Sequence, residues 1–320
     1  MTMYKVPLGN ESQSVQFTLQ CFSDLPRLQI PLFVIFIIIY ADIIFGNIIV
    51  FIAIILDSRL HTPMYIFLSN LSVLDISYTS TILPNFLIML YTQHKTISLI
   101  SCIAQMYFFL TFACCEMILL AVMGYDRYVA ICYPLQYSSL MNPKQCAYML
   151  SCVWITSFME PIVFTIFVAN LSFCSSNYID HFYCDVSPLL KLSCSDTTHV
   201  NFTTYIFGAL VGFSTFMLTL VSYVFIIVNI MKIHSVNRRY TTFSTCASHL
   251  TCVALFYGTT LSLYMRPTSM YSPMHDKFFS LLYIILIPML NPVIYTLKNK
   301  QFKETFEKLI KATRMLILHL

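Results

Sequence analysis

An acid and a base stand side by side, Asp126-Arg127, at the end of a long apolar run. Between Cys102 and Val122 this run carries a single charge, Glu116. A helix rises about 1.5 Å per residue, so the run is long enough to cross a hydrocarbon layer of roughly 30 Å. Charges at the end of such a helix can reach the aqueous interface. Asp126-Arg127 is therefore either a simple stop signal for membrane insertion or an interfacial site, and the rest of the chain must decide.

Two acids lie in the middle of apolar segments, where ionisable groups are functional candidates. If Asp75 and Glu116 face each other, they would share a proton or hold a small cation such as sodium, because bare carboxylates repel strongly in a low dielectric. A neutral, hydrogen-bonded acid pair is the simpler alternative. Asn47 and Asn291 could complete this polar cluster. We expect protonated, hydrogen-bonding roles in helix packing for the other two intramembrane acids, Asp42 and Glu160.

The composition agrees with a membrane protein. Of 320 residues, 58% are hydrophobic and 10% are charged, and the mean hydropathy is +0.74. Soluble proteins usually have about 25% charged residues. The net charge of +4 is no nucleic-acid signature. Most of the 12 cysteines lie inside apolar runs, so they do not indicate a disulfide scaffold.

Seven apolar segments are each long enough to span a bilayer. They cover residues 30–56, 64–90, 102–131, 147–168, 202–233, 243–264 and 278–297. We predict an all-α membrane protein, a seven-transmembrane helix bundle forming one domain over residues 1–320. Residues 1–29 would be an extracellular tail, 30–297 the bundle, and 298–320 a cytoplasmic tail. In that tail, the spacing of apolar residues over 299–320 predicts a short amphipathic helix on lipid headgroups.

Lysine and arginine set the expected orientation. Twelve of them fall on the side of Arg127 and the C-terminus, and six on the other side. The richer side should be cytoplasmic, which puts the N-terminus outside the cell. The sequon at Asn10 would then be available for glycosylation.

Four thiols lie on the predicted outer face: Cys102, Cys174, Cys184 and Cys194. Four cysteines permit three pairings. A metal site at His181 and Cys184 is the weaker alternative, because a disulfide would consume Cys184 and no second ligand pair is near.

Six short motifs run in order along nearly the whole chain, at residues 46–47, 60–72, 123–132, 222–223, 243–250 and 288–295. In these motifs the chain resembles the olfactory receptors, a family of rhodopsin-like G-protein-coupled receptors, and its Tyr264-Met265-Arg266-Pro267 stretch resembles their class II branch. Two positions depart from the family pattern. Gly124 stands where alanine is usual, and Thr241-Thr242 where Lys-Ala is usual, which removes one charge from the coupling face.

The resemblance implies the disulfides Cys102–Cys184 and Cys174–Cys194, and a sodium ion at Asp75 and Glu116 as an allosteric modulator. No other cofactor is expected. Tyr257 falls where the family has the switch aromatic of its sixth segment. Pro292 would kink the seventh segment, since it cannot continue the hydrogen-bond ladder. The residues implied in activation and G-protein coupling are Asp126, Arg127, Tyr128, Tyr223, Arg238, Arg239, His249, Asn291, Pro292 and Tyr295.

The predicted ligand site lies in the outer half of the bundle. Helical spacing puts five residues of the third segment on one face, and the resemblance places this face and parts of later segments around the odorant cavity. The site is mostly apolar with a few hydroxyls, which suits a small volatile. No acid stands at Phe109, so an amine held by a salt bridge is not expected. The predicted lining is Met106, Phe109, Leu110, Ala113, Cys114, Phe207, Val211, Tyr257, Thr260, Leu261, Tyr264 and Ile284.

The expected function is an odorant-activated receptor in the plasma membrane. It would shift toward its active state on binding and raise cyclic AMP through a stimulatory, olfactory-type heterotrimeric G protein. An ectopic receptor for a metabolite or steroid is the alternative within the family. A transporter would need internal repeats, and a membrane enzyme a convergent catalytic motif; the sequence has neither.

Overall fold

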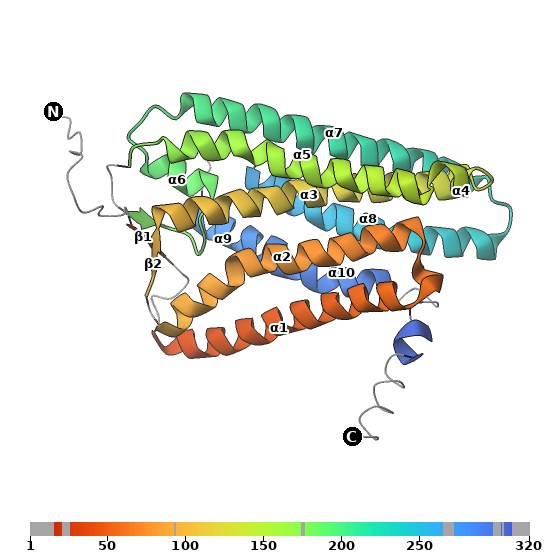
Figure 1. Cartoon of the computed structure of the whole chain (residues 1–320), viewed down its shortest axis with the longest axis horizontal. Coiled ribbons are helices and arrows are strands. Elements are labelled where there is room, and N and C mark those ends of the chain that lie inside the picture. The colour runs from red at the N-terminus through yellow and green to blue at the C-terminus, as the bar shows by residue number, and fades with distance from the viewer. Residues whose placement is uncertain are drawn as a thin grey trace, which may run out of the picture.

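A computed structural model describes residues 16–20, 26–92, 94–173, 177–264, 272–296, 302 and 304–308. Within these residues, seven helical spans are long and apolar enough to cross a membrane, and they run side by side as a bundle (Figure 1). The prediction of a seven-helix membrane protein is confirmed. The spans are α1 (Pro26–Leu56), α2 (Pro63–Thr92), α3 (Leu99–Cys132), α5 (Pro143–Ala169), α7 (Thr198–Met231), α8 (Val236–Tyr264), and α9 (Pro273–Leu281) continued to α10 (Ile287–Thr296).

Local caps fix where two of these helices begin. The Ser98 hydroxyl accepts from the backbone N–H of Ser101 at the start of α3, at 3.2 Å. The Asn142 side chain accepts from the N–H of Gln145 at 2.9 Å, and Pro143 occupies the first position of α5. Such side chains satisfy backbone donors that have no partner within the helix. The helices therefore start several residues before the apolar runs that predicted them.

The seventh span is less regular than the sequence predicts. A π-helical turn, η3 (Leu282–Leu286), joins α9 to α10, and Pro292 lies inside α10. The sequence predicted an irregularity at Pro292 but not the π-turn. A π-turn depends on a backbone hydrogen-bond pattern that residue types do not predict. Gly46 of α1 faces Pro292: a Cβ at this glycine would lie 3.7 Å from the proline ring. The two helices thus meet closely beside the irregular span.

A small sheet closes one end of the bundle, which we call the sheet end. Strand β1 (Gln16–Leu19) pairs antiparallel with β2 (Thr96–Ser98) and parallel with β3 (Tyr178–Ile179). The short helix α6 (Val186–Leu192) lies at the same end (Figure 1). The opposite end, called the Arg127 end, carries η1 (Ser58–Leu60) and α4 (Tyr137–Leu140). Strands were not predicted, because pairings of two to four residues leave little periodic signal.

Helix α3 lies at the centre of the bundle. It packs against α2, α5 and α7, and in Figure 1 it runs between them along the full length of the molecule. The predicted amphipathic helix over residues 299–320 is described only at 302 and 304–308, which are helical. Phe302 and Thr305 are buried there, and Phe306 is 38% exposed.

Candidate functional site

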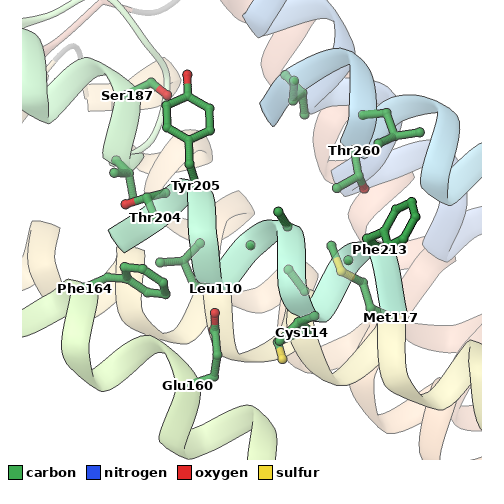
Figure 2. Close-up of a pocket in the computed structure, with 18 of the residues that line it drawn as sticks. Leu110, Cys114, Met117, Glu160, Phe164, Ser187, Thr204, Tyr205, Phe213 and Thr260 are labelled. Carbon is green, nitrogen blue, oxygen red and sulfur yellow. The ribbon is translucent and has the colours of Figure 1, made fainter. Parts of the chain in front are cut away.

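A cavity of about 500 Å³ opens between α3, α5, α7 and α8, beneath α6. Figure 2 shows side chains from all these elements pointing into it. Leu110, Phe164 and Phe216 supply apolar walls, and Thr204 and Thr260 supply hydroxyls. Clefts of this size and chemistry are typical of small-molecule sites.

Seven of the twelve predicted lining residues border this cavity: Leu110, Ala113, Cys114, Val211, Tyr257, Thr260 and Leu261. They come from α3, α7 and α8, elements far apart in the sequence. Tyr257 is buried, and its ring meets that of Phe216 edge-on, with centroids 5.2 Å apart. Their role in binding a ligand remains a prediction.

Four predicted residues lie elsewhere. Met106, Phe109 and Ile284 are fully buried in the core; the Phe109 ring packs against Tyr183 at 4.9 Å between centroids. Phe207 is 41% exposed and packs edge-on against Phe164, 5.9 Å away. Helical spacing predicts which residues share a face of α3. It does not predict how deeply the loop between α5 and α7 enters the bundle and packs against that face. The side chain of the twelfth, Tyr264, lies outside the described residues.

Sequence reasoning missed the walls from α5 and α6. Glu160 and Phe164 stand one turn apart on α5, and Ser187 and Lys191 one turn apart on α6. Helix α6 lies in a loop, where no periodic pattern predicts which side chains turn inward. Glu160 was assigned to helix packing, yet Figure 2 shows its carboxyl directed toward the cavity.

At the Arg127 end, the two neighbouring charges do not pair with each other. The Tyr137 hydroxyl of α4 donates to a carboxylate oxygen of Asp126 at 2.8 Å. The Nε of Arg127 is buried without a hydrogen-bond partner in the described chain. The aromatic ring of Tyr128 packs against Tyr133, 5.6 Å away between centroids. Tyr137 thus engages one oxygen of the acid, while the other oxygen of Asp126, Oδ2, is buried without a hydrogen-bond partner among the described residues.

A second contact at this end joins α7 to α8. The Tyr223 hydroxyl and Nδ1 of His249 lie 2.7 Å apart, with the two rings stacked. Both are buried. Gly124 of α3 lies beside this pair: a Cβ there would be 3.7 Å from the His249 ring and 3.6 Å from Thr219. An alanine would therefore fit at Gly124.

The predicted polar cluster assembles in the middle of the bundle. Asn291 donates to both carboxylate oxygens of Asp75, at 3.2 and 3.1 Å. Asn47 donates to the backbone carbonyls of Ile43 and Pro288, at 3.0 and 3.1 Å. Glu116 is buried near enough to Asp75 to interact electrostatically. The cluster connects α1, α2, α3 and α10.

At the sheet end, the Cys102–Cys184 disulfide is present and ties α3 to the loop between α5 and α7. Cys194 is also disulfide-bonded, but Cys174 lies outside the described residues, so that pairing stays a prediction. In the same loop His181 is 1% exposed, and its two ring nitrogens have no hydrogen-bond partner in the described chain. Burial, helped by the nearby charge of Lys277, lowers the pKa of His181 to about 3.

The other predicted residues have fewer described features. Arg239 is exposed near the start of α8. Asn10 lies outside the described residues, as do the side chains of Arg238 and Tyr295.

Comparisons with known proteins agree with the motifs. A family model described as olfactory receptor matches residues 36–313. Olfactory receptor 5AR1 of Mus musculus is 46% identical, covering 94% of this chain and 97% of the relative. Olfactory receptor 5I1 of Homo sapiens is 45% identical, covering 95% of this chain and 96% of the relative. Olfactory receptor-like protein COR4 of Gallus gallus is 43% identical, covering 94% of this chain and 97% of the relative. The chain therefore belongs to the olfactory receptors, odorant-sensing G-protein-coupled receptors of the plasma membrane that are not enzymes.

Proposed function

We propose that this receptor binds a small volatile in the cavity beneath α6 and raises cyclic AMP through the stimulatory, olfactory-type G protein. The observation that carries the proposal is that one helix, α8, contributes to both sites. Tyr257 and Thr260 line the cavity, and His249, about two turns away, contacts Tyr223 at the Arg127 end. A ligand that favours one position of α8 would therefore bias the Arg127 end.

The ligand can shift this equilibrium only by its difference in affinity for the two states. Outward movement of α8 would open the contact between Tyr223 and His249 and uncover Arg127. The Arg127 guanidinium, whose Nε has no hydrogen-bond partner among the described residues, would then bind the G protein.

The proposed orientation puts the sheet end outside the cell and the Arg127 end in the cytoplasm. The Lys and Arg distribution supports it, because twelve of eighteen fall on the Arg127 side. The disulfide at the sheet end supports it too, since disulfides persist in oxidising compartments.

We also propose that Asp75 and Glu116 hold a sodium ion that modulates activation. The donor set suits it: two buried carboxyls face one region, and hard cations prefer oxygen ligands. Among the described contacts, Asn291 is the one donor to the Asp75 carboxylate, and the Glu116 carboxyl receives no hydrogen bond. A cation there would neutralise the repulsion between the acids.

A cyclic-AMP reporter assay tests the proposal, with surface expression of the receptor verified and a broad odorant panel applied. We expect a dose-dependent response that Arg127→Ala abolishes at unchanged surface level, because the guanidinium is the proposed contact with the G protein. An intact response in Arg127→Ala would contradict this role for Arg127.

A further inference from the structure

An acid in the wall of the cavity, Glu160, has no hydrogen-bond or ion-pair partner among the residues that the structure describes. Glu160 is partly buried on α5. Its surroundings are mainly apolar: Leu110, Phe164 and the thiol of Cys114 lie beside it (Figure 2).

Bulk water at the membrane surface is out of reach of this carboxyl. Helix α5 continues for nine residues beyond Glu160, to Ala169, which is about 13 Å along the helix axis. A glutamate side chain is too short to cover that distance. An unpaired acid in such a setting is costly whether it is charged or neutral, because its polar atoms lose their hydration.

We propose that Glu160 makes the cavity selective for organic amines, with the ligand's ammonium group seated against the Glu160 carboxylate. This inference rests on the proposed function, that the cavity binds the activating ligand. An ammonium supplies both the missing charge and the missing hydrogen-bond donors. A ketone only accepts hydrogen bonds, so it can form a hydrogen bond with Glu160 only when this acid is protonated. An alcohol can donate, but it brings no charge.

The other charge on the lining agrees with this position. Lys191 lies on α6, and Ser187, one turn before it, is on the far side of the cavity from Glu160 (Figure 2). The acid therefore offers an ammonium group its counter-charge on the side of the cavity opposite α6. The apolar walls between them accept a hydrocarbon body. The expectation against amines considered only Phe109 of α3, and the acid comes instead from α5.

The test compares n-octylamine, 1-octanol and 2-octanone, which share a chain length. Each is applied to the wild type and to Glu160→Gln, reading cyclic AMP in cells and the thermal shift of the purified full-length receptor. The matched control is Asp42→Asn, which removes another intramembrane acid on an exposed position of α1, outside the cavity lining.

We expect octylamine to act on the wild type at concentrations at least about tenfold below octanol. Glu160→Gln should weaken octylamine by about tenfold or more and change octanol by less than about threefold, since truncating one partner of a buried charge pair costs at least that much. Asp42→Asn should change neither potency. Glu160→Asp, which keeps the charge on a shorter stem, should fall between the wild type and Glu160→Gln.

Two results would overturn the inference while leaving the proposed function standing. One is a receptor that answers octanol or octanone but neither responds to nor is stabilised by octylamine. The other is an octylamine potency that Glu160→Gln leaves unchanged. If the glutamine variant does not reach the surface, the wild-type thermal shifts decide, because octylamine must stabilise the receptor more than octanol. Silence and absent shifts with every compound, including the broad odorant panel, would count against the proposed function as well.

Discussion

Asp126 and Arg127 are adjacent in the chain, yet a third residue determines what each can do. The Tyr137 hydroxyl donates to Asp126 at 2.8 Å, and the described chain leaves the Nε of Arg127 unbonded. A hydrogen bond to an ionised group is worth about 1.5 to 3 kcal/mol. It competes with an ion pair between the two neighbours. We therefore expect Tyr137 to help keep Arg127 available at the end of α3.

Tyr137→Phe should weaken signalling. Without the phenol hydroxyl, the Asp126 carboxylate turns to Arg127 and occupies it. We expect the concentration giving a half-maximal cyclic-AMP response to rise by about tenfold, at unchanged surface expression. Adding Asp126→Asn should restore much of the response, because an amide holds a guanidinium less strongly. Equal dose–response curves for wild type and Tyr137→Phe would show that Tyr137 does not control Arg127.

At the scale of elements, the described part of the connection between α5 and α7, residues 170–173 and 177–197, forms a compact unit that we call the plug. Strand β3 pairs with β1, Cys184 bonds to Cys102, and α6 covers the cavity. His181 lies buried within it, stacked on Phe182, while Lys277 of α9 pairs with Asp180 at 2.6 Å. Because this plug includes the cavity wall of α6, its stability bears directly on ligand binding.

Acid should loosen this plug through His181. Its pKa is about 3 in the folded protein and 6.5 in an unfolded chain, so the unfolded state binds the proton more readily. This contribution to stability is complete above pH 6.5 and is lost progressively as the pH falls toward 3. At pH 5 the loss is about 2 kcal/mol.

The check is the melting temperature of the purified receptor at pH 7.5 and pH 5. His181→Phe, which keeps an aromatic ring without a titrating group, should reduce the difference between the two temperatures. The control His199→Asn changes an exposed histidine at the start of α7 and should keep the wild-type difference. If His181→Phe also keeps it, another group is responsible for the acid sensitivity.

At the scale of the molecule, α3 links the cavity to the Arg127 end. It carries cavity residues such as Leu110, the buried acid Glu116, and Arg127 at its end. The Cys102–Cys184 disulfide anchors its first turn to the plug, across a sequence separation of 82 residues. Closing so long a loop restricts the unfolded chain strongly.

Cys102→Ser should remove this anchor and lower stability by about 2 to 5 kcal/mol. We expect a large loss of receptor at the cell surface, measured by flow cytometry. Cys152→Ser, at a free and exposed cysteine of α5, is the matched control and should leave the surface level near wild type. Normal surface levels of Cys102→Ser would mean that packing of the plug suffices without the disulfide.

The sequence by itself determined the seven spans. Burying a charge in a bilayer is costly, so each spanning segment must itself be apolar and long enough, and such runs are visible in the sequence. Its ordered motifs also determined the family, and through it the Cys102–Cys184 pairing. The polar cluster of Asp75 and Asn291 was predictable for the same reason, since polar residues inside apolar runs must find each other.

Only the tertiary structure decided which side chains meet. Periodicity gives the face of a helix, but rotation against its neighbours and the depth of the loop above it depend on packing among distant segments. Phe109 therefore lies in the core, whereas Glu160 lines the cavity. Tyr137 reaches Asp126 because α4 packs against α3. The strand pairings and the π-turn at 282–286 likewise depend on backbone hydrogen bonds that residue types alone do not specify.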